Sequence, residues 1–336
     1  MNQRGVNAFV LLFLVIAIAL TAASCSSSSV SAPSVGEEFA FCTGPADQDH
    51  PAISGDILVW QDKRSGNYDI YGYILSKGKE FPICTEENEH GDIIPATSQE
   101  VVVWTDARNY GIHDWEIFGY DLATETEFPI CTNPTWQYAP AISGDIVVWG
   151  DYRKRSYDIY GYNLATDTEF PICTDPATQR NPAISWPIVV WVDKRNDNED
   201  IYGYNLATDT EFIICTDPAK QEDPVISGDI VVWEDYRNGS EDIYAYDLAT
   251  KTEFPICTDP ARQRKPAISG DIVVWWDDRN GNYDIYGYNL ATDTEFPICT
   301  EPAAQWLPAI SGDIVVWQDY RNGNWDIYGT KLSLEE

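Results

Sequence analysis

The sequence of 336 residues carries 54 acidic and 21 basic side chains, which gives a formal net charge of −33 at pH 7. Recognition of phosphate requires an excess of Lys and Arg that displaces counterions, so this charge argues against nucleic acid as a partner. It is compatible with cationic partners, with divalent metal ions, or with solubility in a salty exterior.

The N-terminus has the pattern of a secretion signal. A single basic residue, Arg4, precedes an apolar run from Ala8 to Leu20. This run is too short to span a bilayer as a stable anchor, and small residues follow it. We therefore expect residues 1–24 to be removed on export, so that the mature protein functions outside the cytoplasm.

Cys25 follows Ala22-Ala23-Ser24, which resembles a bacterial lipobox with Ala in place of the usual Leu. We expect Cys25 to be lipidated and to attach the protein to a membrane in the periplasm or at the cell surface. No other membrane contact is expected. Ordinary signal cleavage near the same place, which leaves a free Cys25, is the alternative. Residues 25–36 are rich in Ser, Val and Pro and are expected to form a flexible tether.

A regular repeat runs through the rest of the chain. Seven tryptophans are spaced 44, 45, 42, 42, 42 and 42 residues apart: Trp60, Trp104, Trp149, Trp191, Trp233, Trp275 and Trp317. Such a period is typical of propeller blades or helical repeats. The units are rich in Val, Ile, Tyr and Trp, contain Ser-Gly-Asp and Asn-Gly turns, and lack helical periodicity. Each unit is therefore expected to form four antiparallel strands, in the fifth unit near 224–227, 229–235, 242–248 and 253–258.

The two ends of the repeat region complement each other. The seventh unit, 308–332, stops after its third strand, and residues 38–43 (Glu-Phe-Ala-Phe-Cys-Thr) match the strand that it lacks. Runs such as Ile230-Val-Val-Trp233 are apolar on both faces, so each sheet must be covered on both sides. The sequence therefore predicts an all-β fold, a seven-bladed β-propeller of four-stranded antiparallel blades. Strand 37–43 is expected to complete the last blade and close the ring.

The expected domain is a monomeric propeller over 37–332, followed by a tail at 333–336. Its blades are expected to start near residues 51, 95, 140, 182, 224, 266 and 308. Seven cysteines occupy the same strand of successive units: Cys42, Cys84, Cys131, Cys173, Cys215, Cys257 and Cys299. Equivalent positions on neighbouring sheets lie roughly 10 Å apart or more, whereas a disulfide needs Cα atoms within about 7 Å. Buried, reduced thiols are therefore expected, with a metal cluster as the alternative.

The repeat resembles that of TolB-type propellers. The segments Pro266-Ala-Ile-Ser-Gly-Asp-Ile-Val-Val-Trp275 and Asp284-Ile-Tyr-Gly-Tyr-Asn-Leu290 carry the resemblance, which covers residues 37–332. It implies a propeller fold and an exported protein, but little about function, because this repeat occurs in many exported proteins. TolB itself resembles a six-bladed propeller with an extra α/β domain and a peptidoglycan-associated lipoprotein as partner. This sequence has seven units and no such domain, so the translocation role is not implied.

Every unit contains Trp-x-Asp-x-Arg, followed by an acid that opens the third strand. An Arg between two carboxylates can bind both through its forked donors and so fix the hairpin. A structural role is therefore expected for the seven tryptophans and for Arg64, Arg108, Arg153, Arg195, Arg237, Arg279 and Arg321. The expected second carboxylates are Asp69, Glu116, Asp158, Asp200, Asp242, Asp284 and Asp326.

The sequence gives no strong sign of a metal site or a catalytic site. Hairpins such as 193–200 concentrate oxygen ligands for calcium, but the Arg in each would repel a cation, so no cofactor is expected and calcium is the alternative. His50, His90 and His113 are expected to lie in loops. The chain contains no nucleophile elbow, metalloprotease His pair or phosphate-binding glycine loop, and identical acids in every unit argue against an asymmetric catalytic site. We therefore expect a protein that is not an enzyme.

Recognition is expected on one face of the ring. The loops after strands two and four share this face and vary between units, whereas Ser-Gly-Asp and Leu-Ala-Thr-Asp-Thr repeat on the other face. Aromatic side chains on a rigid ring suit stacking on sugars or anchoring a peptide. The candidate ligand-binding residues are Tyr68, Trp115, Trp136, Tyr138, Tyr157, Arg180, Arg264, Tyr283, Trp306 and Trp325. Drift under weak constraint, with some rings packed on their neighbours, is the alternative.

Three functions remain open. The first is a non-catalytic propeller of the cell envelope or cell surface that binds an envelope protein, a peptide or a glycan through the variable face. The second is a carbohydrate-active enzyme that uses carboxylates near the central channel, which would require one blade with a buried acid pair. The third is a structural or adhesive surface protein that associates with itself.

Overall fold

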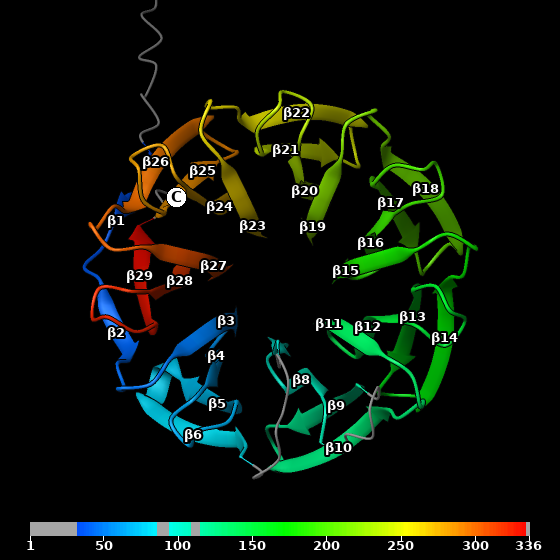
Figure 1. The fold of residues 1–336 in the computed structure, drawn as a ribbon, viewed down its shortest axis with the longest axis horizontal. Helices are drawn as coiled ribbons and strands as arrows, with labels where there is room; N and C mark the ends of the chain where they lie inside the picture. The colour runs from blue at the N-terminus through cyan, green and yellow to red at the C-terminus, as the bar shows by residue number, and fades with distance from the viewer. Residues whose placement is uncertain (1–31, 86–93, 109–114, 334–336) are drawn as a thin grey trace, which may run out of the picture. The chain divides into compact units, whose positions relative to one another are not determined.

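The computed structural model describes residues 32–85, 94–108 and 115–333. These residues form seven antiparallel sheets around a central axis (Figure 1), in a compact unit that begins at Ala32. The predicted seven-bladed β-propeller is confirmed. Cys25 and the rest of the expected signal lie outside the described residues, as do His90 and His113. Within the described part of the chain, no helix is long and apolar enough to cross a bilayer.

Each blade places its four strands in chain order from the axis to the rim (Figure 1). The first strands are β3 (Gln48–Ser54), β7 (Ala96–Thr97), β11 (Gln137–Ser143), β15 (Gln179–Ser185), β19 (Gln221–Ser227), β23 (Gln263–Ser269) and β27 (Gln305–Ser311). The second strands are β4 (Ile57–Asp62), β8 (Val101–Asp106), β12 (Ile146–Asp151), β16 (Ile188–Asp193), β20 (Ile230–Asp235), β24 (Ile272–Asp277) and β28 (Ile314–Asp319).

The third strands are β5 (Asp69–Ile74), β9 (Glu116–Asp121), β13 (Asp158–Asn163), β17 (Asp200–Asn205), β21 (Asp242–Asp247), β25 (Asp284–Asn289) and β29 (Asp326–Ser333). The rim strands are β6 (Lys79–Cys84), β10 (Thr126–Cys131), β14 (Thr168–Cys173), β18 (Thr210–Cys215), β22 (Thr252–Cys257), β26 (Thr294–Cys299) and, in the last blade, β2 (Phe39–Cys42). A short 3-10 turn, η1 (Leu75–Lys77), replaces the usual turn of the first blade.

The N-terminal strand closes the ring as predicted. β2 pairs antiparallel with the first half of β29, and Phe39 lies opposite Gly329. A further strand, β1 (Ser34–Val35), pairs with the end of β29, where Val35 lies opposite Leu332. Residues 34 and 35 were expected to belong to the tether, but they continue the same sheet because β29 is two residues longer than the other third strands.

Except in blade two, where β7 begins at Ala96, the first strands begin about three residues earlier than the sequence suggested. In blade five the strand starts at Gln221 rather than near residue 224, and a register shift separates Glu222 from Val225. The side chain of Gln221 is fully buried and donates a hydrogen bond from Nε2 to the carbonyl of Ala219 at 2.6 Å. This bond ties the strand to the preceding loop. His50 follows the same register, so it lies in β3 rather than in a loop.

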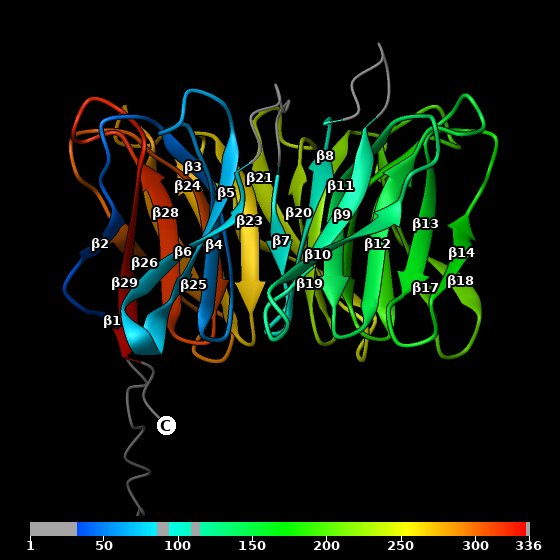
Figure 2. The same cartoon turned by 90° about the horizontal axis from the view of Figure 1, so that it is seen from below.

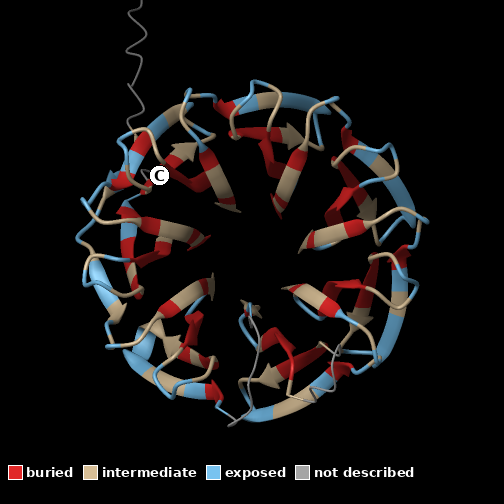
Figure 3. Cartoon of the chain, viewed as in Figure 1, coloured by how far each residue is buried: buried red, intermediate tan, exposed pale blue. Residues whose placement is uncertain are grey.

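The core lies between the blades, where each sheet is covered by its two neighbours. Burial is greatest along the second strands (Figure 3). The seven repeat tryptophans all have no exposed surface. In one interface, Val190 and Val192 of blade four pack with Val231 and Trp233 of blade five. Because every buried face needs a neighbouring blade, a single sheet could not form this core alone.

The two faces of the ring differ in origin (Figure 2). Turns after the first and third strands form one face, which we call the constant face, and loops after the second and fourth strands form the variable face. The described part of the chain begins and ends at the constant face, because Ser34 pairs with Ser333 and the Leu332 N–H bonds the Asp313 carbonyl at 2.7 Å. The variable face therefore points away from the side where the chain enters the propeller.

Candidate functional site

A repeated clamp holds the base of the variable face. In blade four, Asp193 is fully buried and accepts hydrogen bonds from Trp191 Nε1 at 3.0 Å and Arg195 Nη2 at 2.7 Å. Arg195 lies over the Tyr202 ring, 4.2 Å from its centroid. It also contacts Cys173 Sγ at 3.3 Å. The Arg thus joins its own hairpin to the rim strand of the preceding blade.

The second carboxylate of the clamp differs from the prediction. Arg195 Nη1 donates to Glu211 of β18 at 2.6 Å, not to Asp200, which lies opposite Asp193 in the sheet and is held by Asn196 and Asn198. The equivalent partners in the other blades are Glu80, Glu127, Glu169, Glu253, Glu295 and, in the last blade, Glu38. The prediction failed because a strand-opening acid points back into its own hairpin, whereas the rim Glu reaches across the sheet.

The described cysteines are reduced thiols, as expected, and all except the half-buried Cys42 are buried. Burial raises the pKa of Cys131, Cys173, Cys215 and Cys257 to about 12. Because the thiolate is the reactive form, these thiols are held in their unreactive state. Within the described ranges, no group of three or more His, Cys, Asp or Glu side chains is arranged to hold a metal ion.

Aromatic side chains follow one another around most of the variable face. The residue just before the third strand is aromatic in blades six, seven, one, two and three, which follow one another around the closed ring. It is acidic in blades four and five. We call this row the aromatic arc; it consists of Tyr283, Trp325, Tyr68, Trp115 and Tyr157. All five are half-buried. Lys63 Nζ lies 4.2 Å from the centre of the Tyr68 ring, and the Trp115 carbonyl accepts the Gln137 N–H.

The arc broadens into a cluster of rings at blades six and seven. Trp306 stacks on Tyr283, with centroids 6.1 Å apart, and lies 6.1 Å from Trp325. Trp325 meets the edge of Tyr320 at 5.1 Å, and Tyr320 is 44 % exposed. Trp276 packs beneath Tyr283 and Trp306 and is almost fully buried. The outer rings of this cluster are therefore available to a partner, while the inner ones support them.

A second cluster lies on blade three. Trp136 is 37 % exposed and stacks on Tyr152 at 5.7 Å, and Tyr152 contacts Tyr157 at 4.9 Å. A backbone hydrogen bond from the Tyr152 N–H to the Trp136 carbonyl, 2.9 Å long, fixes the two loops relative to each other. Trp136 is thus an exposed ring at the blade-three end of the arc, and Tyr320 is an exposed ring beside Trp325 in blade seven.

Tyr138 packs within the fold and is not exposed on the variable face. Its ring occupies the space next to Gly150, where an added Cβ would lie 2.5 Å from Tyr138 Cε1. Its hydroxyl accepts a hydrogen bond from the backbone of Asn181 in the next blade, and burial raises its pKa. The same backbone position is bonded by Gln318 in the last blade, which accepts from the His50 N–H at 3.1 Å. Variation at these positions therefore includes alternative ways to join adjacent blades.

Charged residues take the place of the arc in blades four and five. Arg180 binds Glu199 at 2.6 Å and Glu222 at 2.5 Å. Lys220 binds Glu222 at 2.6 Å, and Lys194 binds Glu199 at 2.8 Å. Three bases and two acids thus form one network across the junction of these blades, which places Arg180 in an ion-pair network rather than at a free binding position.

One fully buried acid breaks the repeat. Glu234 follows the repeat tryptophan of blade five, where Gln61, Val192 and Gln318 stand in other blades. It accepts hydrogen bonds from Arg264 Nε at 3.1 Å and from the Lys265 N–H at 2.7 Å.

Glu234 also shares a hydrogen bond with Asp223, whose Oδ2 and Oδ1 accept from Lys265 and Asn181, respectively. Burial, followed by the Asp223 charge, raises the pKa of Glu234 to about 7. Lys265 holds the pKa of Asp223 below its usual range against the effect of burial. Arg264, a candidate ligand-binding residue, is therefore engaged by a buried acid pair.

Replacing Glu234 with Gln is expected to stabilise the protein at high pH. Because the folded pKa is raised, the folded state retains a proton that the unfolded state releases, so stability falls as pH rises from about 4.5 to about 7. Gln at position 234 keeps an oxygen acceptor for the Lys265 N–H and does not ionise. Gln318 accepts from the His50 N–H in the same way in the last blade. The free-energy difference between E234Q and the wild type should grow by on the order of 2 kcal/mol between pH 5 and pH 8 in urea unfolding.

E241Q, which removes a partly exposed acid nearby, is the matched control and should show no such trend. A difference between E234Q and the wild type that stays constant with pH would contradict the raised pKa.

A cavity of about 300 Å³ opens at the ring axis on the variable face. It is lined by seven prolines and by the residue before each of them: His50, Ile94, Ala139, Asn181, Asp223, Lys265 and Leu307. Its polar side, at blades four to six, is formed by Asn181, Asp223 and Lys265, with Glu234 buried beside them. The opposite side is formed by Leu307, Ile94 and Ala139, so the cavity is asymmetric although the prolines repeat.

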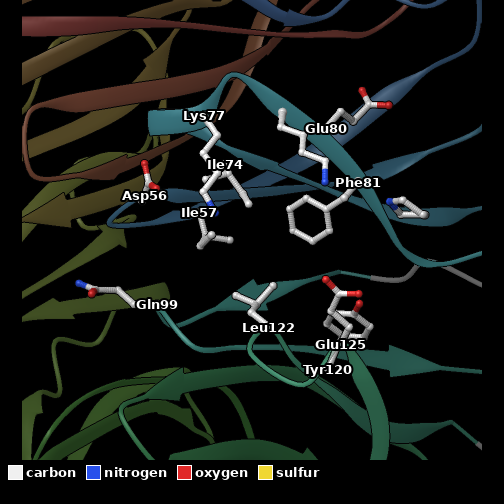
Figure 4. Close-up of a pocket in the computed structure, with 12 residues that line it drawn as sticks. Asp56, Ile57, Ile74, Lys77, Glu80, Phe81, Gln99, Tyr120, Leu122 and Glu125 are labelled. Atoms are coloured by element: carbon white, nitrogen blue, oxygen red, sulfur yellow. The ribbon is translucent and has the colours of Figure 1, made fainter.

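Grooves between blades open toward the constant face. The groove between blades one and two, about 610 Å³, is lined by apolar Ile57, Phe81 and Leu122 and by Lys77 and Glu125 (Figure 4). Grooves between blades two and three and between blades five and six use the corresponding Phe and Leu positions. Because the same residues form each groove, these grooves follow from the repeat and distinguish one blade from another only weakly.

The sequence patterns missed Tyr152, Tyr320, Trp276 and Glu234. The first two belong to hairpins whose variability was recognised only at the residue before the third strand. The others directly follow the repeat tryptophan, at a position that the sequence patterns did not compare between units. A position-by-position comparison of the units would have found Glu234, because Glu occurs there in one blade only.

Comparison with known proteins shows the fold of the chain. No family model and no curated protein matches it. A puromycin-hydrolyzing peptidase of Mycobacterium tuberculosis superposes with a TM-score of 0.63 and 13 % identity over 81 % of this chain; the chain covers 50 % of that protein's length.

An oligogalacturonate lyase from Vibrio parahaemolyticus superposes with a TM-score of 0.65 and 13 % identity, over 89 % of this chain and 96 % of the lyase. TolB from Acinetobacter baumannii gives 0.53 and 13 % identity, over 87 % of this chain and 80 % of TolB. A peptidase, a lyase and TolB thus share this architecture, and the fold alone does not indicate an activity. What the repeat, the blade count and these superpositions establish together is that the chain has a TolB-like β-propeller fold.

Proposed function

We propose that this protein is a non-catalytic binding propeller of the cell envelope or cell surface, which holds a glycan, peptide or protein partner on its variable face. The observation that carries the proposal is the aromatic arc. The same repeat position is aromatic in five consecutive blades and acidic in the other two. Rings held by a rigid scaffold provide contact area at a small cost in conformational entropy, which suits recognition.

The direction of the face supports this function. The chain enters the propeller at the constant face, beside the end of β29. A lipid at Cys25, as the sequence predicts, would hold the constant face toward the membrane and present the variable face to the surroundings.

Replacing an exposed ring beside the arc is expected to weaken binding. W136A and Y320A should each weaken retention on a glycan array or a peptide library at least tenfold, because exposed aromatic anchors contribute more than 1 kcal/mol to such interfaces. Trp186 provides a matched control, since it is 55 % exposed and lies in a turn of the constant face. Binding that W186A reduces as much as W136A does would contradict the proposal.

A carbohydrate-active enzyme is the second candidate, and the acid pair Glu234–Asp223 favours it. A carboxyl group with a pKa near 7 beside a cavity is the arrangement expected of a general acid. Both acids are held by bases, however, and each is engaged within the protein. Turnover of a polysaccharide that E234Q abolishes without loss of binding would establish the enzyme and displace the binding proposal.

A further inference from the structure

Basic side chains gather on one part of the variable face. Seven of the 21 basic residues are the clamp arginines, and among the remaining ones Lys154, Lys194, Lys220 and Arg262 lie in the variable-face loops of blades three to six. We call these four residues the basic arc. They are 50 %, 46 %, 39 % and 46 % exposed, respectively.

The acids that pair with the basic arc lie beneath it. Lys154 contacts Asp158, and Lys194 contacts Glu199; these acids are only 1 % and 14 % exposed. Lys220 contacts Glu222, and Arg262 contacts Asp278, which are 12 % and 19 % exposed. The pairs balance in formal charge, but they form two layers in which the cationic groups are outermost. A partner that approaches these four residues therefore meets ammonium and guanidinium groups, with the exposed Asp197 carboxylate of the blade-four hairpin among them.

The outward charge of the arc differs from that of the rest of the molecule. On the constant face, exposed acids lie in the turns of most blades: Asp56, Glu125, Asp145, Asp167, Asp209, Asp229, Asp271 and Asp293. At physiological ionic strength the Debye length is about 8 Å, so these distant charges are largely screened at the variable face. The local cationic layer therefore decides which partner binds there.

Aromatic rings adjoin the basic arc at both of its ends. At blade three, Lys154 lies in the same hairpin as Tyr152, two residues further along the chain, and Tyr152 stacks on Trp136. At blade six, the Arg262 guanidinium lies 6.0 Å from the centre of the Tyr283 ring in the aromatic arc. A partner that spans both features must supply anionic groups along the basic arc and flat apolar surfaces at its two ends.

We propose that the variable face binds an anionic polysaccharide, with carboxylates on the basic arc and sugar rings on the adjoining aromatic side chains. This inference rests on the proposed binding function and adds the chemical class of the ligand. Each base is already partly neutralised by its acid, so a single contact is weak. Several contacts along a polymer are needed, which favours a repeating polyanion over a small anion. An acidic peptide supplies carboxylates but lacks the flat apolar ring faces that suit Trp136 and Tyr152.

Two cellulose derivatives with the same backbone test the charge directly. Carboxymethyl-cellulose is anionic and hydroxyethyl-cellulose is neutral, and binding of the full chain to each is measured by biolayer interferometry. Carboxymethyl-cellulose should bind at least tenfold more tightly, and raising NaCl from 50 to 500 mM should weaken this binding. The double variant K194Q/K220Q should lose about tenfold in affinity. K77Q/K79Q, which removes two exposed lysines near the constant face, is the control and should bind as the wild type does.

The outcomes separate the ligand class from the binding function. Equal binding of both celluloses that W136A abolishes would overturn the anionic ligand and leave the binding face intact. If polyglutamate binds as tightly as carboxymethyl-cellulose does, the proposal of a polysaccharide ligand is overturned in favour of an acidic polypeptide. Failure of both celluloses to bind would also overturn this inference. Binding that only K77Q/K79Q or W186A reduces would overturn the variable face itself. Melting temperatures of all variants within about 3 °C of the wild type establish that folding is retained.

Discussion

Deletion of residues 32–43 is expected to lower the free energy of unfolding by on the order of 5 kcal/mol, a large part of the stability of a typical domain. The deletion removes β1 and β2, so that β29 becomes a free sheet edge. It also removes the contacts of Phe41 and Cys42 with the last interface and the ion pair between Glu38 and Arg321. Urea unfolding followed by tryptophan fluorescence measures the loss, and size-exclusion chromatography should detect association through the exposed edge.

The variants E38A and E211A show whether ring closure or the ion pair is responsible. Both remove a rim Glu from a clamp, but only Glu38 bridges the two ends of the chain. Each should cost about 1 kcal/mol or less, because the pairs are partly exposed. A truncated chain that remains monomeric and unfolds at the same urea concentration as the full chain would show that β1 and β2 do not close the ring.

The variant D193A is expected to destabilise the protein by about 3–5 kcal/mol. Asp193 has no exposed surface and accepts bonds from the Trp191 indole, the Arg195 guanidinium and the Arg195 N–H. Its removal leaves a partly buried cation and an indole N–H without their acceptor, which costs more than the pair itself contributes. The loss is measured by urea unfolding at pH 7.

The variant D193N is the matched control, because it keeps one oxygen acceptor and the side-chain volume. It should lose less stability than D193A, and the mutation of the neighbouring surface residue in K194A should cost under about 1 kcal/mol. Equal small effects for D193A and K194A would contradict a structural role for the clamp.

The sequence was sufficient to predict the fold because the same pattern of apolar strands and turns recurs in every unit. The spacing from Trp60 to Trp317 indicated seven blades, and the strand around Phe39 and Cys42 indicated closure. Both follow from rules that apply to each blade alike, namely that apolar faces must be covered and sheet edges paired. The bounds of individual strands were less certain because the bulge after Gln221 and the extension of β29 depend on backbone hydrogen bonds that leave little trace in the sequence.

The site was only partly predictable, for a different physical reason. Variation between blades correctly indicated one face, but it does not distinguish an exposed side chain from one that fills a gap in its own blade. Tyr138 varies because Gly150 leaves space beside it, and Arg264 varies because Glu234 requires a base. Tyr283, Trp306 and Trp325 were predicted separately, and the structure brings them into one cluster. These two pairings join residues 23 and 19 positions apart, one between blades six and seven and one within blade seven, so neither appears when equivalent positions of the repeat are compared.

The asymmetry of the face follows from these pairings. An identical repeat would present seven equal surfaces. The residues directly before the third strands instead divide the ring into an aromatic part and a charged part. Each part is supported from below, by Trp276 under the rings and by Glu199 and Glu222 under the bases. A scaffold that is constant at its clamps can therefore vary its recognition surface without loss of the fold.

Site-specific photo-crosslinking tests the binding face most directly. A benzophenone amino acid is placed at position 320 on the variable face or at position 186 on the constant face, and each protein is irradiated with cell-envelope extract. Both native side chains are exposed, so neither substitution removes a core contact. The account predicts a discrete crosslinked product from position 320 that excess unlabelled protein suppresses, and no such product from position 186. Crosslinking from position 186 with none from position 320 would contradict it.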